Sequence, residues 1–364
     1  MALQIALDLD YLAANVHGRR SRLAEAERLD ALCRLRTVTD LARALFPESR
    51  FLTAAALQRV LILDQVEELT EIASRLGGAA GRILDWLGVR FQMENLKVLA
   101  RGLVAAGDST GRAGGMALED LRPHLILLPD DLALPVEALA SAGSVEAFAA
   151  LVPHEPLRDG LKRGGDLFAR RPKAFFLEAG LDAGYLEELL ARARALPAAD
   201  RREILPIALQ EADTFHMMLA ARGKFHYGLG PEAIVPFHVR KTRIPRRSFE
   251  AMAAAEHVAD VASSAAGAAL DEVPAVAKET LTPADLEPLA WGRYYRLANR
   301  AFRRCHMGLG AVVAYAAIRR VELANLITLS EGIRLGQSAD AIRRRLIPAA
   351  PGRGPAAQRE PTRV

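Results

Sequence analysis

Three stretches of the chain decide its fold: FQMENLKVLARG (residues 91–102), DTFHMMLAARG (residues 213–223) and ELANLITLSEG (residues 322–332). Successive copies are separated by close to one third of the 364 residues. When the three final glycines are superposed, a polar residue seven positions earlier coincides in every copy. Because internal repetition governs architecture, this pattern predicts three related helical units and argues against an enzyme pocket that is built only once.

The shared polar residues are Asn95, His216 and Asn325. In the first copy Phe91 lies four residues before the asparagine and Val98 three residues after it, which places the polar side chain on the apolar stripe of a helix. A polar group on a buried stripe must be hydrogen-bonded. We therefore expect each of these side chains to bond to the backbone of an adjoining helix or turn.

The three copies end in Gly102, Gly223 and Gly332. A glycine just after a periodic stretch is typical of a left-handed helix stop, so each of these glycines is expected to end its helix. Arg101 and Arg222 stand before the first two glycines, where a cation opposes the negative end of the helix dipole. The third copy, which opens with Glu322, breaks this rule because Glu331 replaces the arginine.

A second element repeats ahead of the first, at residues 32–44, 139–151 and 252–262. Each copy reads as a short apolar helix, a polar break and a valine that opens another helix. Thr37 and Ser144 are good N-caps at this break, whereas His257 is a poor one. Both elements keep the same order along the chain, which chance similarity would rarely produce.

The composition is that of a helical protein. Apolar residues make up 51% of the chain and aromatic ones only 5%, and good helix formers dominate. No run of alternating apolar residues indicates a sheet, although residues 125–128 fit either a short strand or a buried helix fragment. We expect an all-α fold with three helical units, at residues 1–125, 126–240 and 241–348. Residues 349–364 are expected to form a flexible basic tail.

Local signals refine this picture. The glycine-rich residues 105–117 are expected to form a loop. Thr282, Pro283 and Asp285 form a helix start, with a cap, a first-turn proline and an early acid.

Charge and cysteine content exclude several classes. The formal net charge of +4 is small for 48 basic and 44 acidic residues and does not by itself indicate nucleic acid. Cys33 and Cys305 are too few for a disulfide framework. The start of the chain lacks a basic region and a cleavage-site pattern, so we expect no signal peptide. The best apolar run, residues 307–318, is shorter than the roughly 18 residues that a membrane span needs.

One basic run is a candidate interface, although such runs are more often solvated faces. It consists of Arg240, Lys241, Arg243, Arg246 and Arg247.

The sequence offers little catalytic chemistry. It has no phosphate-binding P-loop and no paired cysteine or histidine motif for zinc. Asp8 and Asp10 resemble a metal-binding pair of carboxylates, but a helical pattern follows them directly. Cys305 and His306 form an isolated pair at a helix end. Because no nucleophile, base and orienting group come together, we expect no catalytic residue, no cofactor and no metal.

The repeats resemble the C subunit of the V/A-type rotary ATPases, whose eukaryotic counterpart is called the d subunit. Residues 314–332 are similar to that family's tyrosine, glutamate, asparagine–leucine and glycine helix, and 338–346 to its short terminal helix. Residues 94–102 are similar to its first such helix and 211–223 to its second, with His216 in place of asparagine. Residues 11–23 are similar to its opening helix, so the resemblance extends over about residues 8–348.

This resemblance implies three helical domains related by pseudo-threefold symmetry, arranged as a funnel. It further implies a non-catalytic coupling protein that lies on the cytoplasmic face of the membrane, peripheral to the inner membrane of a bacterium. A protein in that position caps the rotor ring of proteolipid subunits, receives the foot of the central stalk and transmits torque for ion translocation. The glycine-rich loop, His216 and Glu331 mark a divergent member.

Two alternatives remain open at this stage. The first is a soluble α-helical repeat adaptor or scaffold that is unrelated to rotary ATPases. The second is an all-α enzyme that uses Asp8, Asp10 or His306. The sequence does not determine the direction of ATP turnover, the choice between protons and sodium ions, or the residues that contact the ring and the stalk.

Overall fold

The computed structural model describes residues 2–48, 53–107, 118–274 and 279–348. This part of the chain is all-α, as the sequence predicted, and its only β-type contact is one bridge between Ala266 and Leu270. The α-helices are α1 (Ala2–Arg20), α2 (Ala26–Leu32), α3 (Val38–Leu45), α4 (Ala54–Ser74), α5 (Gly78–Gly107), α6 (Leu118–Leu121), α7 (Val136–Ala140), α8 (Val145–Leu151), α9 (Glu155–Phe168), α10 (Ala174–Arg194), α11 (Ala198–Phe225), α12 (Pro231–Ile234), α13 (Arg246–Ala254), α14 (Val258–Ala265), α15 (Pro283–Arg304), α16 (Leu309–Arg334) and α17 (Ala339–Arg343). The 3-10 turns are η1 (Arg122–His124), η2 (Asp130–Leu132) and η3 (Val235–Phe237).

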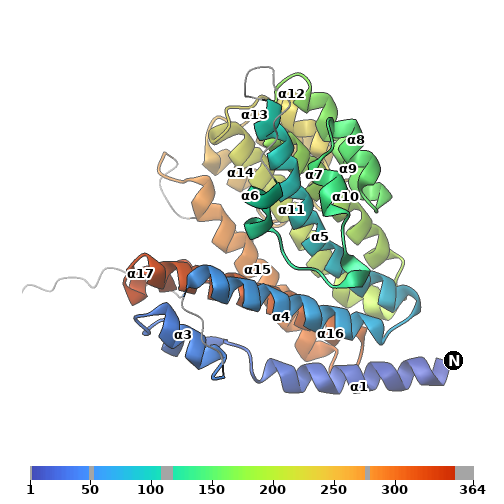
Figure 1. The fold of residues 1–364 in the computed structure, drawn as a ribbon, viewed down its shortest axis with the longest axis vertical. Coiled ribbons are helices and arrows are strands. Elements are labelled where there is room, and N and C mark those ends of the chain that lie inside the picture. The colour runs from blue at the N-terminus through green and yellow to red at the C-terminus, as the bar shows by residue number, and fades with distance from the viewer. Residues whose placement is uncertain (1, 49–52, 108–117, 275–278, 349–364) are drawn as a thin grey trace, which may run out of the picture.

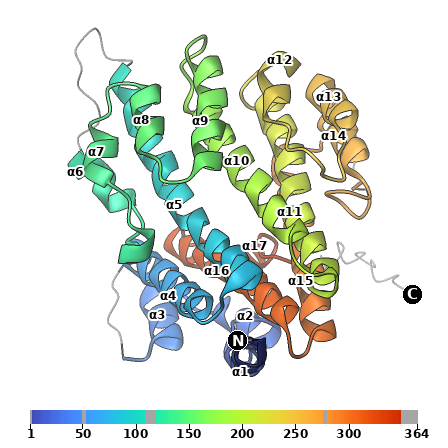
Figure 2. The same ribbon diagram turned by 90° about the vertical axis from the view of Figure 1, so that its right-hand side faces the viewer.

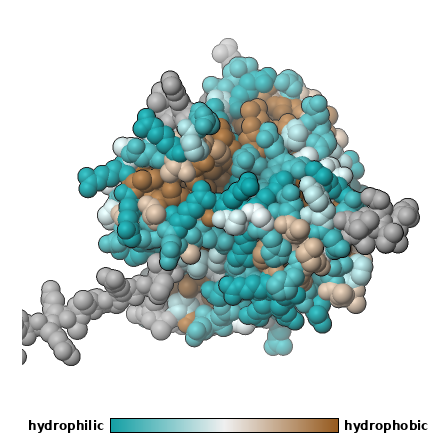
Figure 3. All heavy atoms as spheres, turned by 90° about the horizontal axis from the view of Figure 1, so that it is seen from below, coloured by the Kyte–Doolittle hydropathy of each residue, from teal (hydrophilic) through white to brown (hydrophobic). Residues whose placement is uncertain are grey.

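Three pairs of long consecutive helices form the body: α4 with α5, α10 with α11, and α15 with α16. In Figure 1, α1, α4 and α16 lie across the lower part of the molecule, while α5, α10 and α11 stand above them. Figure 2 shows the short helices α8, α12, α13 and α14 at the far end of the upright helices. On the face seen from below in Figure 3, hydrophilic side chains predominate, and hydrophobic ones gather in bands between them.

Two short helices precede each long pair. They are α2 and α3, α7 and α8 (with α9 following), and α13 and α14. The second repeated element of the sequence covers only the last one to three residues of the first helix in each case, then the link and a second helix that begins at Val38, Val145 and Val258 as predicted. The Thr37 and Ser144 side chains accept hydrogen bonds from the third residue of their helices, as expected of N-caps. At His257 the structure has a capping box with Asp260, whose Oδ2 accepts the His257 backbone N–H at 3.1 Å. The predicted start at Thr282 is confirmed as a capping box with Asp285.

The closest helix contact in the molecule's upper part is between α9 and α10, and four glycines make it possible. Gly160 and Gly164 on α9 face Gly180 and Gly184 on α10. A Cβ added to Gly180 would lie 2.2 Å from the carbonyl oxygen of Gly160, a distance that real Cβ atoms do not reach. The two backbones therefore touch directly, and the extra helix α9 is fixed to the long pair without any side chain in between.

The glycines that end the three sequence repeats do not stop their helices, so that prediction was wrong. Gly102, Gly223 and Gly332 all lie inside α5, α11 and α16, which continue beyond them. Left-handed backbone occurs instead at Gly228 (φ 61°) and Gly336 (φ 67°), a few residues later. Glycine serves both as a helix stop and as a site of close approach, and the sequence pattern alone does not distinguish the two uses.

Close approach is the reason for glycine at these three places. A Cβ would lie 2.7 Å from Leu121 Cδ1 at Gly102, 2.9 Å from Ile234 Cδ1 at Gly223 and 2.5 Å from Ile342 Cγ1 at Gly332. Leu121, Ile234 and Ile342 belong to the short helices α6, α12 and α17 that come after each long helix. Each glycine thus lets the next short helix fold back onto its long helix.

Several expectations fall on the edges of the described regions. Residues 125–128 form neither a strand nor a helix and lie in the link between η1 and η2. Of the expected loop at 105–117, residues 105–107 belong to α5 and the remainder lies outside the described residues, as does the expected tail at 349–364. The expected boundaries at 125/126 and 240/241 fall in links between helices, and the division into three domains stays a prediction.

Candidate functional site

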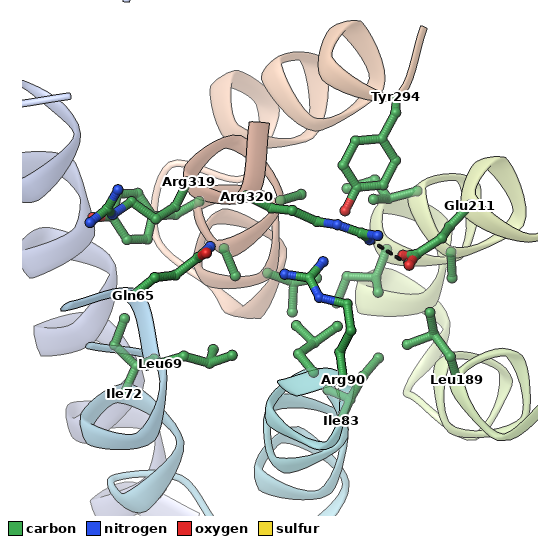
Figure 4. A pocket seen from close by; sticks show the side chains of 18 of the residues that line it. Gln65, Leu69, Ile72, Ile83, Arg90, Leu189, Glu211, Tyr294, Arg319 and Arg320 are labelled. Carbon is green, nitrogen blue, oxygen red and sulfur yellow. Dashed lines mark hydrogen bonds and ion pairs between the residues drawn. The ribbon is translucent and has the colours of Figure 1, made fainter. Parts of the chain in front are cut away.

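The three long repeat helices bring one equivalent charged residue each to a central cavity. Arg90 on α5, Glu211 on α11 and Arg320 on α16 all stand five residues before Asn95, His216 or Asn325. They line a cavity of ≈ 40 Å³ between α4, α5, α10, α11, α15 and α16. Figure 4 shows these three side chains meeting in the middle of the view. The sequence comparison had not singled them out, although the constant spacing from the shared polar residue could have revealed them.

Arg320 is fully engaged in this cavity. Its guanidinium forms an ion pair with Glu211 and lies over the ring of Trp291, 4.6 Å from the centroid. Burial opposes the charge of Arg320, but the attraction of Glu211 outweighs it and raises the pKa of this arginine. The pair joins α16 to α11 across the centre of the molecule.

Arg90 has no such partner among the described residues. Its guanidinium lies 5.3 Å from the centroid of the neighbouring Phe91 ring, and no carboxylate of the described chain is within ion-pair distance. Burial, followed by repulsion from Arg320, lowers the pKa of Arg90. The cavity also contains an unsatisfied acceptor, because Gln65 is 4% exposed and its Oε1 atom has no hydrogen-bond partner.

At the other end of the cavity Arg319 connects the lining residue Glu68 to two carboxylates outside the cavity. Arg319 on α16 pairs with Glu68 at 3.0 Å, with Glu322 at 2.7 Å and with Asp64. Burial raises the pKa of Glu322, with Arg319 acting in the opposite direction. Tyr315 donates its hydroxyl hydrogen to Glu68 at 2.7 Å. This network ties α16 to α4, and removal of the Arg319 guanidinium would leave the buried Glu322 carboxylate without a counter-charge, while Glu68 would keep its pair with Arg19.

The shared polar residues of the repeats bond to backbone, as predicted from their position on a buried stripe. Asn95 Nδ2 donates to Ile126 O at 2.8 Å and its Oδ1 accepts from Ile126 N at 2.7 Å. Asn325 forms the same two bonds with Ile347, at 2.7 and 2.8 Å. His216 keeps the acceptor half of the arrangement, because its Nε2 accepts from Val239 N at 2.8 Å. In each copy the bonded residue comes after a short helix or turn that packs on the long helix.

Three residues earlier on the same helices, a second set of buried polar side chains reaches forward to the next segment. Gln92 donates to Leu132 O at 2.9 Å, and Asp213 accepts from the backbone of Arg243 at 3.1 Å. In the third copy Glu322 accepts from Ala24 N, which lies just before α2 at the start of the chain. In the first two copies this contact is made with the segment that follows the long helix. In the third copy the equivalent contact is made with a residue near the beginning of the chain.

The residues before the repeat glycines show the same arrangement. Arg101 on α5 pairs with Glu178 on α10 at 2.6 Å, and Arg222 on α11 pairs with Glu287 on α15 at 2.6 Å. On α16 the corresponding Glu331 accepts from Gln58 on α4 at 2.7 Å. The three partners are Glu178, Glu287 and Gln58, which stand at corresponding places before the shared polar residues to within one residue. In the third copy glutamate stands in place of the arginine, and its partner is the amide of Gln58 in place of a glutamate.

The model of one protein family matches the chain over residues 12–345, and that family is described as the ATP synthase (C/AC39) subunit. The chain belongs to this family. The family is that of the C, or d, subunits of V/A-type ATPases, in agreement with the resemblance seen in the sequence repeats. A comparison with curated proteins found no match. Within the described residues of this C/AC39 subunit, no helix has both the length and the apolar character needed to cross a bilayer.

The basic run of this C/AC39 subunit divides into two parts. Arg243 turns inward, where its Nε lies 2.6 Å from Asp213 Oδ2 and its guanidinium also contacts Gln210. Arg240, Lys241, Arg246 and Arg247 are exposed. Arg240 and Lys241 line a groove of ≈ 820 Å³ together with residues of α9 and α10. Arg243 therefore has a structural role, and the other four residues remain the candidate interface.

The residues considered for catalysis lie apart from the central cavity. Asp8 and Asp10 are on α1, and His306 follows α15. The backbone oxygen of His306 lies 2.8 Å from His17 Nε2, which connects α15 to α1. Cys305 packs its Sγ against Gly310, and burial raises the pKa of its thiol. In the described part of the chain, no three His, Cys, Asp or Glu residues are grouped so that they could hold a metal ion.

Proposed function

We propose that this C/AC39 subunit is the non-catalytic coupling component of the central rotor in a V/A-type rotary ATPase. In this role it joins the central stalk to the proteolipid ring in the membrane and transmits torque for ion translocation. Its location is the cytoplasmic side of the inner membrane, as a peripheral part of the complex. The family match over residues 12–345 supports membership of such a complex.

The observation that carries the coupling role is the closed circuit of helix contacts. We use this name for the three pairs Arg101–Glu178, Arg222–Glu287 and Glu331–Gln58. They connect α5 to α10, α11 to α15, and α16 back to α4. Because the last pair returns to the first long pair, a force applied to one unit is carried by all three. A protein that transmits rotation needs this resistance to shear, and we propose that the three units form a funnel with pseudo-threefold symmetry.

The candidate interface is proposed as one of the rotor contacts. Arg240, Lys241, Arg246 and Arg247 present positive charge to the outside, and the first two lie beside α9 and α10. Exposed cations of this kind steer association with acidic surfaces and contribute little to the stability of the fold. We propose that an acidic face of a neighbouring rotor protein binds here.

The experiment that tests this function is purification of a tagged chain from detergent-solubilised membranes of its host. We expect a small, very hydrophobic ring protein, stalk proteins and ATP-binding proteins to be recovered with it. Recovery from the soluble fraction alone, without ATPase components, would overturn the coupling role and favour the adaptor alternative.

Charge reversal then tests the interface within the same experiment. The double variant Arg240→Glu/Lys241→Glu should lower the recovery of rotor proteins, whereas Arg170→Glu/Arg171→Glu, at equally exposed positions after α9, should not. Equal recovery of rotor proteins with both double variants would show that the basic run is not part of the interface. The coupling role would then be tested by the copurification experiment alone.

A further inference from the structure

The central cavity contains an unbalanced positive charge. At one end, Arg319 is surrounded by Asp64, Glu68 and Glu322. At the other end, Arg90 and Arg320 share the single carboxylate of Glu211, and that carboxylate is already paired with Arg320. Figure 4 shows the Arg319 guanidinium turned away from Arg90 and Arg320. The carboxylates around Arg319 therefore do not form ion pairs with Arg90.

A half-buried guanidinium without an acceptor is costly, since its five N–H groups have lost part of their hydration. The cavity of ≈ 40 Å³ is large enough for roughly three water-sized probes and too small for a nucleotide. An occupant must therefore be small and must accept hydrogen bonds from Arg90.

We propose that this cavity binds one small monovalent anion, of the size of chloride or formate, between the guanidiniums of Arg90 and Arg320. The anion supplies to Arg90 the negative charge that Glu211 supplies to Arg320. Bound there, it joins α5 to α16 as the Glu211–Arg320 pair joins α11 to α16. The site does not depend on the proposed rotor function, because it lies wholly within the chain.

The test uses the purified full-length chain and chloride as the probe. Chloride replaces gluconate at constant sodium and constant ionic strength, since gluconate is too large for the cavity. We expect the protein to broaden the ³⁵Cl resonance, with an excess line width that falls as rising chloride saturates the site, and we expect the melting temperature of the protein to rise with chloride but not with gluconate. Formate should reproduce the rise in melting temperature and should compete with chloride in the line-width measurement.

The variant Arg90→Gln should weaken the chloride effect by about tenfold or more, because a charge-assisted contact is lost. Arg247→Gln, which changes an exposed arginine, should leave it unchanged. If Arg90→Gln does not fold, Gln65→Glu provides the same test, since a carboxylate added to the cavity lining occupies the place of the anion. An equal response to chloride and gluconate, or a chloride effect that survives in the folded variant, would overturn the proposal.

Discussion

Replacing His216 by asparagine, the residue of the other two copies, is expected to remove a pH dependence from the stability of the chain. His216 is fully buried, and its Nε2 accepts the Val239 N–H, so the ring must be neutral at this atom. Burial lowers the pKa of His216 to about 3, and the His238 ring stacked 4.7 Å away acts in the same direction. Asparagine can form the Val239 bond without titrating.

The sign and the size come from proton linkage. The unfolded chain binds a proton at this histidine below its ordinary pKa of 6.5, whereas the folded chain does not until about pH 3. The stabilising contribution is therefore fully present above pH 6.5 and is lost as the pH falls from 6.5 toward 3. The loss is about 1.4 kcal/mol per pH unit, which amounts to about 2 kcal/mol at pH 5.

Urea unfolding at pH 5, 6, 7 and 8 measures this effect. The free energy of unfolding of the wild-type chain should fall more steeply below pH 6.5 than that of His216→Asn, and the difference should grow by about 2 kcal/mol between pH 7 and pH 5. Buried carboxylates such as Asp213 titrate in both proteins and cancel in this difference. His226→Asn, which changes an exposed histidine after α11, should follow the wild-type curve. Parallel curves for the wild type and His216→Asn would refute the reasoning.

Three further predictions concern packing and charge. Asn325→Ala removes both bonds to Ile347 and should cost about 1–3 kcal/mol, with faster hydrogen exchange in α17 than in Thr328→Ala. Gly180→Ala places a Cβ against the Gly160 carbonyl and should cost about 1–3 kcal/mol or more in urea unfolding, whereas Gly143→Ala, which has open space, should be nearly neutral. Arg319→Met should cost about 3–5 kcal/mol, because the buried Glu322 loses its counter-charge, whereas Glu68 keeps its pair with Arg19, and Arg334→Met should cost less than about 1 kcal/mol by the same measurement.

The repeat could be predicted from the sequence because its marks are rigidly spaced. Asparagine and glycine lie seven residues apart on one helix face, and a helix does not tolerate insertions there. The backbone partners could not be located in advance, since they lie 31, 23 and 22 residues further along the chain in the three copies. The links between helices vary in length, and only the folded structure shows that Ile126, Val239 and Ile347 occupy equivalent places.

The central charges were missed for a different reason. Arg90, Glu211 and Arg320 keep a constant spacing from the shared polar residues but differ in sign, so a search for identical residues does not find them. Opposite charges at equivalent positions are nevertheless needed where three helices converge, because three like charges would repel one another in a small cavity. A position in a repeat can thus be equivalent by place and complementary by charge.

The Glu331 departure shows the same logic at the edge of the molecule. In isolation, an acid in the last turn of a helix opposes the dipole. In the structure, Arg334 pairs with it at 2.7 Å, and the Gln58 amide donates to it at 2.7 Å, where a glutamate at that place would repel it. The exchange of sign therefore involves both partners and keeps the contact between the last long helix and the first. Together with the Glu322–Ala24 bond, it holds α16 to the first part of the chain at two places, so α16 completes the circuit of helix contacts.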